Sequence, residues 1–315
     1  MSKNEVIDFG LKPVYEDNNV FGDEIAYIKC YDFSKANLSK EHRLHAVTSV
    51  ASICYNNPKA IGSESLFNRL EQESKGLPSS SFEFIKMLIP ESKILDAAKD
   101  KPNINLAELN IYRFGFSIYV GGIKHILTNY RAVVYDLKEN NIDLTNFYNN
   151  ENECNYIKFF SYTFKIRMDT NTRAQFVRHR IASYQELSRR YVSGNKVPFS
   201  YYISESMSNV TSRYILVDEQ TNHSQALDIT TKQLHDMCTN HYFDCLKAGV
   251  KAQDARRCLP QSMYTDIWVN IDTYSLRNFY NIRSSQHAQW EIKILAESMK
   301  IFSDGMALSV IDLIK

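Results

Sequence analysis

Charged and polar side chains gather between residues 178 and 191 at a density that a folded core does not require. The stretch reads RHRIASYQELSRRY and contains four arginines. Arginine carries a planar fork of N–H donors that binds phosphate oxygens two at a time, and the neighbouring Gln185 and Glu186 can pair with the edge of a base or a sugar. We therefore predict that this stretch binds a phosphorylated nucleotide.

Simpler explanations exist for the same residues. Arginines most often pair with carboxylates on a solvated surface. Ser183, followed three residues later by Glu186, also fits the capping box that begins a helix. No His or Asp lies at a spacing that ties it to Ser188 as a base, so we expect the Ser188 hydroxyl to bind a ligand and not to act as a nucleophile.

Two later blocks extend the pattern. The second block, at 255–265, reads ARRCLPQSMYT, and the third, at 275–291, reads SLRNFYNIRSSQHAQWE. With the first block, in which seven residues separate Arg178-His179-Arg180 from Ser188, they resemble the flavin-dependent thymidylate synthases in order and spacing. The resemblance implies the fold of that family, in one large domain that comprises residues 1–315.

The resemblance also implies which residues bind the ligands. The dUMP site would be lined by arginines and polar side chains from all three blocks, namely Gln175, Arg178, Glu186, Ser188, Arg189, Arg190, Arg256 and Arg283. The flavin would be contacted by Arg178, His179, Arg180, Ile181, Asn278 and His287. Arg283 and Ser188 are the residues that we expect at the reacting end of the site, where Arg283 would stabilise the anionic charge that develops on the pyrimidine. As alternatives, the two histidines could be core residues bonded to the backbone and Asn278 could cap a turn.

The reaction implied by the resemblance converts dUMP to dTMP. The carbon unit would come from methylenetetrahydrofolate, and the reductant would be FAD that NADPH has reduced. The protein would supply orientation and electrostatics, without a cysteine nucleophile and without a metal. The family forms homotetramers in which each site draws residues from several subunits, so we expect a homotetramer here, with Arg256 and Arg283 contributed by a neighbouring subunit.

Two features depart from the family pattern. The family usually carries a histidine in the segment before the strand that leads into the motif, and the candidate segments at 76–83, 103–108 and 152–154 lack it. Residues 272–274 read Asp-Thr-Tyr where the family has Asn or Arg. Two alternatives therefore stay open: a catalytically degenerate nucleotide-binding homologue, and a related pyrimidine-modifying flavoenzyme.

Composition excludes several other classes. With 315 residues, of which 44% are hydrophobic, the chain can bury a large core, and its net charge of +1 argues against a nucleic-acid-binding module. Six cysteines show neither Cys-x-x-Cys pairs nor a histidine at metal spacing, so we expect reduced thiols and a cytoplasmic protein. The N-terminus lacks the apolar run of a signal peptide, and no stretch of about 18 apolar residues suggests a membrane span.

Hydrophobic periodicity predicts alternating helices and strands. Helices are expected at 40–55, 123–137, 234–246 and 292–302, with Gly249 and Gly305 ending the last two; strands are expected at 114–120 and 162–166. Residues 56–81 read as a loop with one helical turn at 67–70, and 139–155 read as a surface excursion. The mixture predicts an α+β fold, with a mixed or antiparallel sheet flanked by helices.

One region exceeds the ordinary length of the family. Residues from about 85 to 158 are expected to be an insertion in the single domain. Residues 111–137 also weakly resemble 160–187, which would make part of the insertion an internal repeat whose first copy lost its site.

Overall fold

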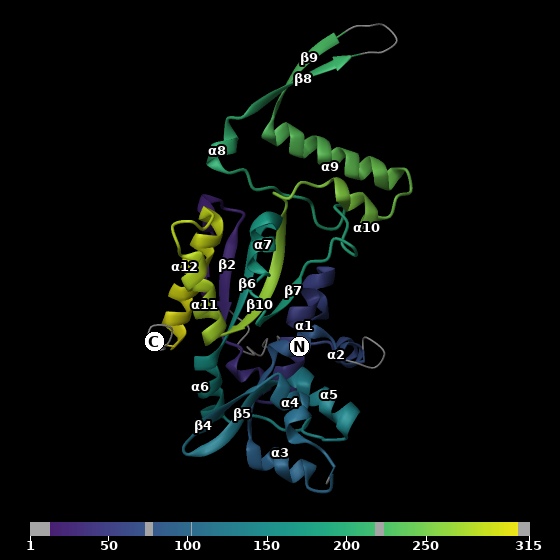
Figure 1. Ribbon diagram of the computed structural model, residues 1–315. Coiled ribbons are helices and arrows are strands. Elements are labelled where there is room, and N and C mark those ends of the chain that lie inside the picture. Colours follow the sequence, from purple (N-terminus) through teal and green to yellow (C-terminus); the bar gives the residue numbers. More distant parts are fainter. Residues whose placement is uncertain (1–12, 73–77, 102, 218–223, 308–315) are drawn as a thin grey trace, which may run out of the picture.

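Three antiparallel sheets with helices packed against them form the structure, which confirms the predicted α+β fold (Figure 1). The computed structural model describes residues 13–72, 78–101, 103–217 and 224–307. Within these ranges, no helix combines the length and apolar character needed to cross a bilayer.

The central sheet has the strand order β1-β2-β6-β10-β7. Its strands are β1 (Pro13–Asp17), β2 (Tyr27–Tyr31), β6 (Ser161–Asp169), β10 (Tyr264–Asp272) and β7 (Ala182–Glu186). Successive side chains of β10 enter opposite cores: Ile267 and Val269 pack with α11 (Thr273–Arg283) and α12 (Trp290–Ala307), whereas Trp268 packs with α1 (Lys40–Tyr55). The sheet is therefore covered by helices on both faces.

A second sheet, of order β3-β5-β4, lies at one end of the molecule (Figure 1). Its strands are β3 (Lys86–Pro90), β4 (Phe116–Val120) and β5 (Ile123–Asn129). The helices around it are α3 (Glu91–Ala98), α4 (Asn110–Arg113), α5 (Tyr130–Asn140) and α6 (Glu151–Phe160), whereas α2 (Glu64–Glu71) packs on α1. This sheet lies wholly within the segment that the sequence predicts as an insertion.

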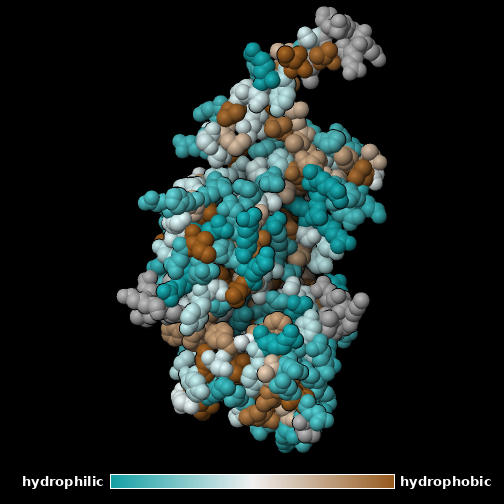
Figure 2. All heavy atoms as spheres, in the orientation of Figure 1, coloured by the Kyte–Doolittle hydropathy of each residue, from teal (hydrophilic) through white to brown (hydrophobic). Residues whose placement is uncertain are grey.

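A two-stranded arm projects from the opposite end (Figure 1). It pairs β8 (Thr211–Val217) with β9 (Ser224–Thr230) and is followed by α9 (Thr231–Lys247). The remaining short helices are α7 (Thr170–Phe176), α8 (Glu205–Ser208), α10 (Ala252–Ala255) and 3-10 turns at Val20–Gly22, Ser34–Asn37, Pro58–Ala60, Ser80–Phe84, Leu106–Glu108 and Arg256–Cys258. Hydrophobic residues show on the surface of the arm (Figure 2), where Ile215 and Val217 are 69% and 57% exposed.

Several predicted elements are confirmed. The helix at 40–55 is found with the same bounds because Ser39 caps its first turn and Asn56, in the left-handed region, ends it. The strand at 162–166 is the centre of β6. The helix at 234–246 is α9, which is followed by Gly249 at φ +86°.

Other predictions were wrong. Residues 123–129 form β5 and only the following residues form α5, so the predicted helix at 123–137 begins too early. Helix α12 continues through Gly305 to Ala307. The loop at 56–81 contains all of α2, longer than the predicted turn, and its residues 73–77 lie outside the described ranges. The resemblance of 111–137 to 160–187 does not extend to structure, since the first is α4-β4-β5-α5 and the second is β6-α7-β7.

The predicted surface excursion at 139–155 is instead tied to the core. Asn149 and Glu153 are buried, and Glu153 completes a capping box at the start of α6. Arg43 of α1, only 2% exposed, donates from Nη1 to the carbonyl of Thr145 at 2.6 Å and from Nη2 to that of Phe147 at 2.9 Å. A buried guanidinium therefore fastens this segment to α1.

Candidate functional site

The three sequence blocks meet beside the central sheet. Glu186 of β7 accepts a hydrogen bond from the Thr265 hydroxyl of β10 at 2.9 Å and forms an ion pair with Arg173 of α7 at 3.4 Å. Arg283, at the end of α11, donates from Nε to His179 Nε2 at 3.1 Å. These contacts join the first block to the second and to the third, across separations of 79 and 104 residues.

Arg283 is held in place by His179 of the first block and by Gln175, which lies just before that block. Its Nη2 donates to the Gln175 carbonyl at 3.3 Å, and the Gln175 side chain donates to Gln289 Oε1 at 2.5 Å. The His179 ring meets Phe279 edge to face, with 4.7 Å between ring centroids. Gln175, His179 and Arg283 thus form one bonded cluster within a single chain, whereas the resemblance implies that Arg283 enters the site from a neighbouring subunit.

His179 must be neutral for this contact, because its unprotonated Nε2 accepts a hydrogen bond from Arg283 Nε. Burial lowers the pKa of His179, and the Arg283 guanidinium lowers it further. The same direction, with burial as the first cause, applies to the pKa values of His42, His45 and His235.

We expect the unfolding temperature to fall as the pH is lowered below about 6.5, the ordinary pKa of histidine. In that window the unfolded chain binds protons that the folded chain does not, so acid favours unfolding, and above it these residues make no such contribution. Thermal melts followed by circular dichroism between about pH 5.5 and 7.5 measure how the melting temperature depends on pH. His179→Gln should make this dependence on pH weaker, and a melting temperature that rises on acidification contradicts the expectation.

Ser188 lies just beyond β7, next to the end of α1. Its N–H donates to the Cys54 carbonyl at 3.3 Å and its carbonyl accepts from Tyr191 N–H at 3.0 Å. Among the described residues its hydroxyl has no hydrogen-bond partner, so the hydroxyl is available to a ligand. The alternative in which Ser183 caps a helix is wrong, because Ser183 lies inside β7 and pairs with Asn270 of β10.

Most of the predicted arginines are not engaged in surface ion pairs. Within the described ranges, no carboxylate forms an ion pair with the guanidinium of Arg178, Arg180, Arg190, Arg256 or Arg283. All of these except Arg283 are exposed, as are Ile181, Asn278 and His287. The structure therefore leaves these cations open to an anionic ligand, although it places Arg256 in a separate 3-10 turn, where its Nε donates to the Gln253 carbonyl at 3.2 Å.

Arg189 differs from its neighbours. Its side chain is buried, donates to the Val197 carbonyl at 2.6 Å and lies over the Phe199 ring, 4.7 Å from the centroid. Burial lowers the pKa of this guanidinium. The Arg189 guanidinium, which we expected to contact dUMP, thus contacts the loop that follows the motif.

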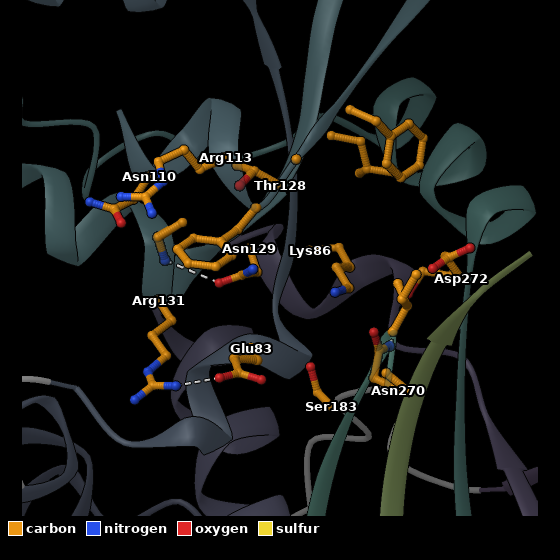
Figure 3. A pocket seen from close by; sticks show the side chains of 18 of the residues that line it. Glu83, Lys86, Asn110, Arg113, Thr128, Asn129, Arg131, Ser183, Asn270 and Asp272 are labelled. Carbon is orange, nitrogen blue, oxygen red and sulfur yellow. Dashed lines mark hydrogen bonds and ion pairs between the residues drawn. The ribbon is translucent and has the colours of Figure 1, made fainter. Parts of the chain in front are cut away.

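A cavity of about 730 Å³ opens beside the start of β7 (Figure 3). On one side its lining comes from Arg180 to Ser183 and from Asn270 and Asp272 of β10. On the other side it comes from the second sheet and its helices, including Lys86, Arg113 and Arg131. Sequence reasoning named Arg180 and Ile181 but missed the residues of the second sheet, because no local pattern ties them to the motif.

No group of three or more His, Cys, Asp or Glu in the described ranges is arranged to hold a metal ion. Cys30, Cys54, Cys154, Cys238, Cys245 and Cys258 are all free thiols. Burial raises the pKa of the Cys154 thiol to about 11, which makes it a poor nucleophile near neutral pH.

Comparison with known proteins gives a family match. A family model described as thymidylate synthase complementing protein matches residues 127–303, more than half of the chain. The chain belongs to this family. The thymidylate synthase complementing match includes all three sequence blocks and begins within the segment expected as an insertion.

Curated relatives carry the name flavin-dependent thymidylate synthase. The chain is 34% identical to that of Thermotoga neapolitana over 146 residues, which is 45% of this chain and 62% of the relative. It is 32% identical to that of Geobacter sulfurreducens over 136 residues (43% and 53%) and 32% identical to that of Sulfolobus acidocaldarius over 139 residues (44% and 47%). The matched part thus spans less than two thirds of each of these relatives.

Among solved structures, the chain is similar to a UMP/dUMP methylase, PolB from Streptomyces cacaoi, determined with bound 5-Br UMP. The sequence identity is 21%, the match covers 48% of this chain and 72% of that one, and the TM-score is 0.37.

Proposed function

We propose that this protein is a flavin-dependent thymidylate synthase that converts dUMP to dTMP, with methylenetetrahydrofolate as carbon donor and NADPH as reductant. The observation that carries the proposal is the bonded cluster of Gln175, His179 and Arg283, which unites sequence blocks 104 residues apart. The names of the curated relatives support the same activity. The reaction requires fixed cations for the nucleotide phosphate, and the motif provides arginines that form no ion pair with a carboxylate in the described part of the chain.

The residues of the cluster have distinct proposed roles. Arg283 would stabilise the negative charge that develops on the uracil ring, and neutral His179, which accepts a hydrogen bond from its Nε, would fix its orientation. Ser188, Arg178 and Arg190 would bind the dUMP phosphate, while Gln175 and Glu186 would lie near the sugar and base. Reduced FAD would supply the reducing equivalents.

The residues present fit a flavin dinucleotide. Such a ligand carries two phosphates and an aromatic ring system, and the motif offers Arg178 and Arg180, which pair with no carboxylate among the described residues, beside the 77% exposed Ile181. His179, Asn278 and His287 complete the set proposed to contact the flavin.

The first test is the visible absorption spectrum of the purified protein, recorded as isolated and again after addition of FAD and dUMP. Flavin bands followed by dTMP formation with methylenetetrahydrofolate and NADPH are the expected result. Flavin binding without product would exclude the synthase and leave the pyrimidine-modifying alternative, which other carbon donors would test. Absence of flavin binding would overturn the flavoenzyme proposal.

A second candidate function is nucleotide binding without turnover. It is favoured by one observation: the residues that line the cavity beside β7 include no histidine. Retained dUMP affinity in a protein that never binds flavin would establish this function in place of the first.

Replacing Ser188 with alanine is expected to weaken dUMP binding about tenfold, since a hydrogen bond from a hydroxyl to a charged phosphate contributes about 1.5 kcal/mol or more. Isothermal titration of dUMP into both proteins measures the change. Ser193→Ala, a similar substitution just past the motif, serves as the control. An unchanged affinity in Ser188→Ala would assign the hydroxyl a purely structural role.

We also propose a homotetramer in the cytoplasm, built from a single domain with an insertion at about 85–158. The β8-β9 arm supports self-association, because an isolated two-stranded hairpin is marginally stable in water and Tyr214, Ile215 and Val217 are exposed on it. Light scattering on the eluting protein measures the mass, and a monomer at micromolar concentration would exclude the tetramer.

A further inference from the structure

Three cysteines lie together where α9 packs against α10 and the 3-10 turn at Arg256–Cys258 (Figure 1). Cys238 and Cys245 belong to α9, and Cys258 is the last residue of the turn. Residues seven apart on a helix are separated by about two turns, so the two α9 thiols share one face of the helix. All three cysteines are free and partly exposed, so a small molecule in the solvent can reach them.

The Cys258 thiol lies against the backbone of α9. Its Sγ is 3.6 Å from the carbonyl oxygen of Cys238 and 3.1 Å from that of Ala255. The carbonyls of a helix point toward its C-terminal end, so the Cys238 carbonyl is directed at the turn formed by residues 239–242. The Cys258 sulfur therefore lies on the side of Cys238 that is nearer to Cys245.

The Cys245 side chain approaches the same turn from the other end of α9. Helical side chains lean toward the N-terminus of their helix. Cys245 follows this rule, because its Sγ lies 3.6 Å from Nε2 of His241, one turn earlier. The same rule directs the Cys238 side chain away from this turn. Of the two α9 thiols, Cys245 is thus the one directed at Cys258.

The charges around Cys258 agree with this placement. Burial raises the pKa of the Cys258 thiol, and negative charge on Cys245, followed by negative charge on Cys238, raises it further. A like charge has this effect only at short range, so the three sulfurs are close neighbours. Because the thiolate is the nucleophilic form of cysteine, Cys258 is the less reactive member of a pair with Cys245.

Cys245 has a proton acceptor beside it. The His241 side chain is exposed, and its Nε2 can take the proton of the Cys245 thiol, which leaves a thiolate next to an imidazolium. A thiolate attacks peroxides and is oxidised to a sulfenic acid, which condenses with a second thiol where one is within reach. Cys245 and Cys258 provide such a nucleophile and such a second thiol.

We propose that Cys245 and Cys258 form a redox-active pair of thiols that a peroxide converts to a disulfide. In the first step the Cys245 sulfur attacks the peroxide and the O–O bond breaks. Cys245 becomes a sulfenic acid, and the other oxygen leaves with a proton as water or an alcohol. In the second step the Cys258 sulfur attacks the Cys245 sulfur, so that an S–S bond forms, the S–O bond breaks and water leaves. The two thiols lose two electrons, which reduce the peroxide.

The disulfide would join α9 to the turn that carries Arg256. Arg256 is one of the residues that we propose for dUMP binding, so the bridge would restrict the movement of a proposed ligand-binding residue. Only this effect on Arg256 rests on the proposed function, because the disulfide forms with or without a bound nucleotide. In a reducing compartment such a bridge is transient and responds to oxidants.

The test treats the reduced protein with hydrogen peroxide and then blocks the remaining thiols with N-ethylmaleimide in denaturant. Intact mass counts the blocked thiols, and we expect six before oxidation, two fewer after it and six again after treatment with dithiothreitol. Tryptic peptides 233–247 and 258–277 contain the three cysteines and should be found joined. Chymotrypsin, which cleaves between Cys238 and Cys245, identifies the α9 partner.

Cys238→Ser is the matched control, since it removes the other thiol from the same face of α9. It should form the bridge as wild type does, whereas Cys245→Ser and Cys258→Ser should form none. His241→Gln should slow the formation of the bridge without changing which thiols are joined, and an unchanged rate would exclude His241 as the proton acceptor. Circular dichroism verifies that each variant is folded, and Cys258→Ala replaces Cys258→Ser if the serine variant is not.

A disulfide between Cys245 and Cys258 that dithiothreitol reverses supports the proposal. Three results overturn it: survival of all six thiols, oxidation to sulfinic acids without a bridge, and a disulfide between any other pair. Neither FAD nor dUMP is added in this experiment. Failure of the proposed function would therefore leave its result unchanged, and failure of the disulfide to form would leave the proposed function intact.

Discussion

Replacing Arg283 with alanine is expected to lower kcat/KM for dUMP about 10- to 100-fold while the protein stays folded. A hydrogen bond to a charged group contributes about 1.5–3 kcal/mol, and each 1.4 kcal/mol is about a factor of ten. The bonds that Arg283 makes to His179 and to the Gln175 carbonyl are partly exposed, so their loss should cost little stability.

The matched control is Arg277→Ala, the same change earlier on α11, where the guanidinium makes no hydrogen bond or ion pair with described residues. It should retain activity. Arg283→Lys should recover part of the loss, because lysine restores the charge but not the planar fork. Activity in Arg283→Ala equal to that of wild type would remove this residue from the site.

The second large effect concerns stability. Arg43→Leu is expected to lower the free energy of unfolding by about 3–5 kcal/mol, because the change leaves the buried Asn37 Oδ1 and the half-buried carbonyls of Thr145 and Phe147 without their donor. It also removes the guanidinium from the face of the Tyr130 ring, 3.9 Å from its centroid. Urea unfolding followed by fluorescence measures the loss.

Arg69→Leu is the control for this substitution. Arg69 is exposed on α2, so its replacement should change the free energy of unfolding by about 0.5 kcal/mol at most. If Arg43→Leu were as mild, the segment at 141–150 would be held by its own turns and not by α1.

The elements that the sequence predicts correctly are those with local signals. Helix α1 has a serine at its N-terminus and an asparagine that adopts φ 46° at its C-terminus, so both ends are marked in the sequence. In β6, Tyr162, Phe164 and Ile166 occupy one face, which gives the two-residue period of a strand. The arginine motif was likewise recognisable from its residue types alone.

The elements that the sequence misses depend on distant partners. Strand β5 is buried on both faces, with Ile126 in one core and Leu127 in another, so it lacks the alternation of a half-exposed strand. The polar segment before α6 is tied to the core by hydrogen bonds from Arg43 and Asn37, which precede it by more than 100 residues in the sequence. Lys86 and Arg113 lie near the motif because of the way β3, β4 and β5 pair with one another. Local sequence does not determine this pairing.

Both walls of the cavity belong to one polypeptide, and this has a thermodynamic consequence. A site assembled within one chain forms whenever that chain folds, so its occupancy depends on free ligand and not on protein concentration. A site that includes arginines of a neighbouring subunit instead loses its ligand as the subunits dissociate. Dilution would thus separate the two kinds of site in this protein, because a ligand bound in the cavity would stay bound after contacts between subunits are lost.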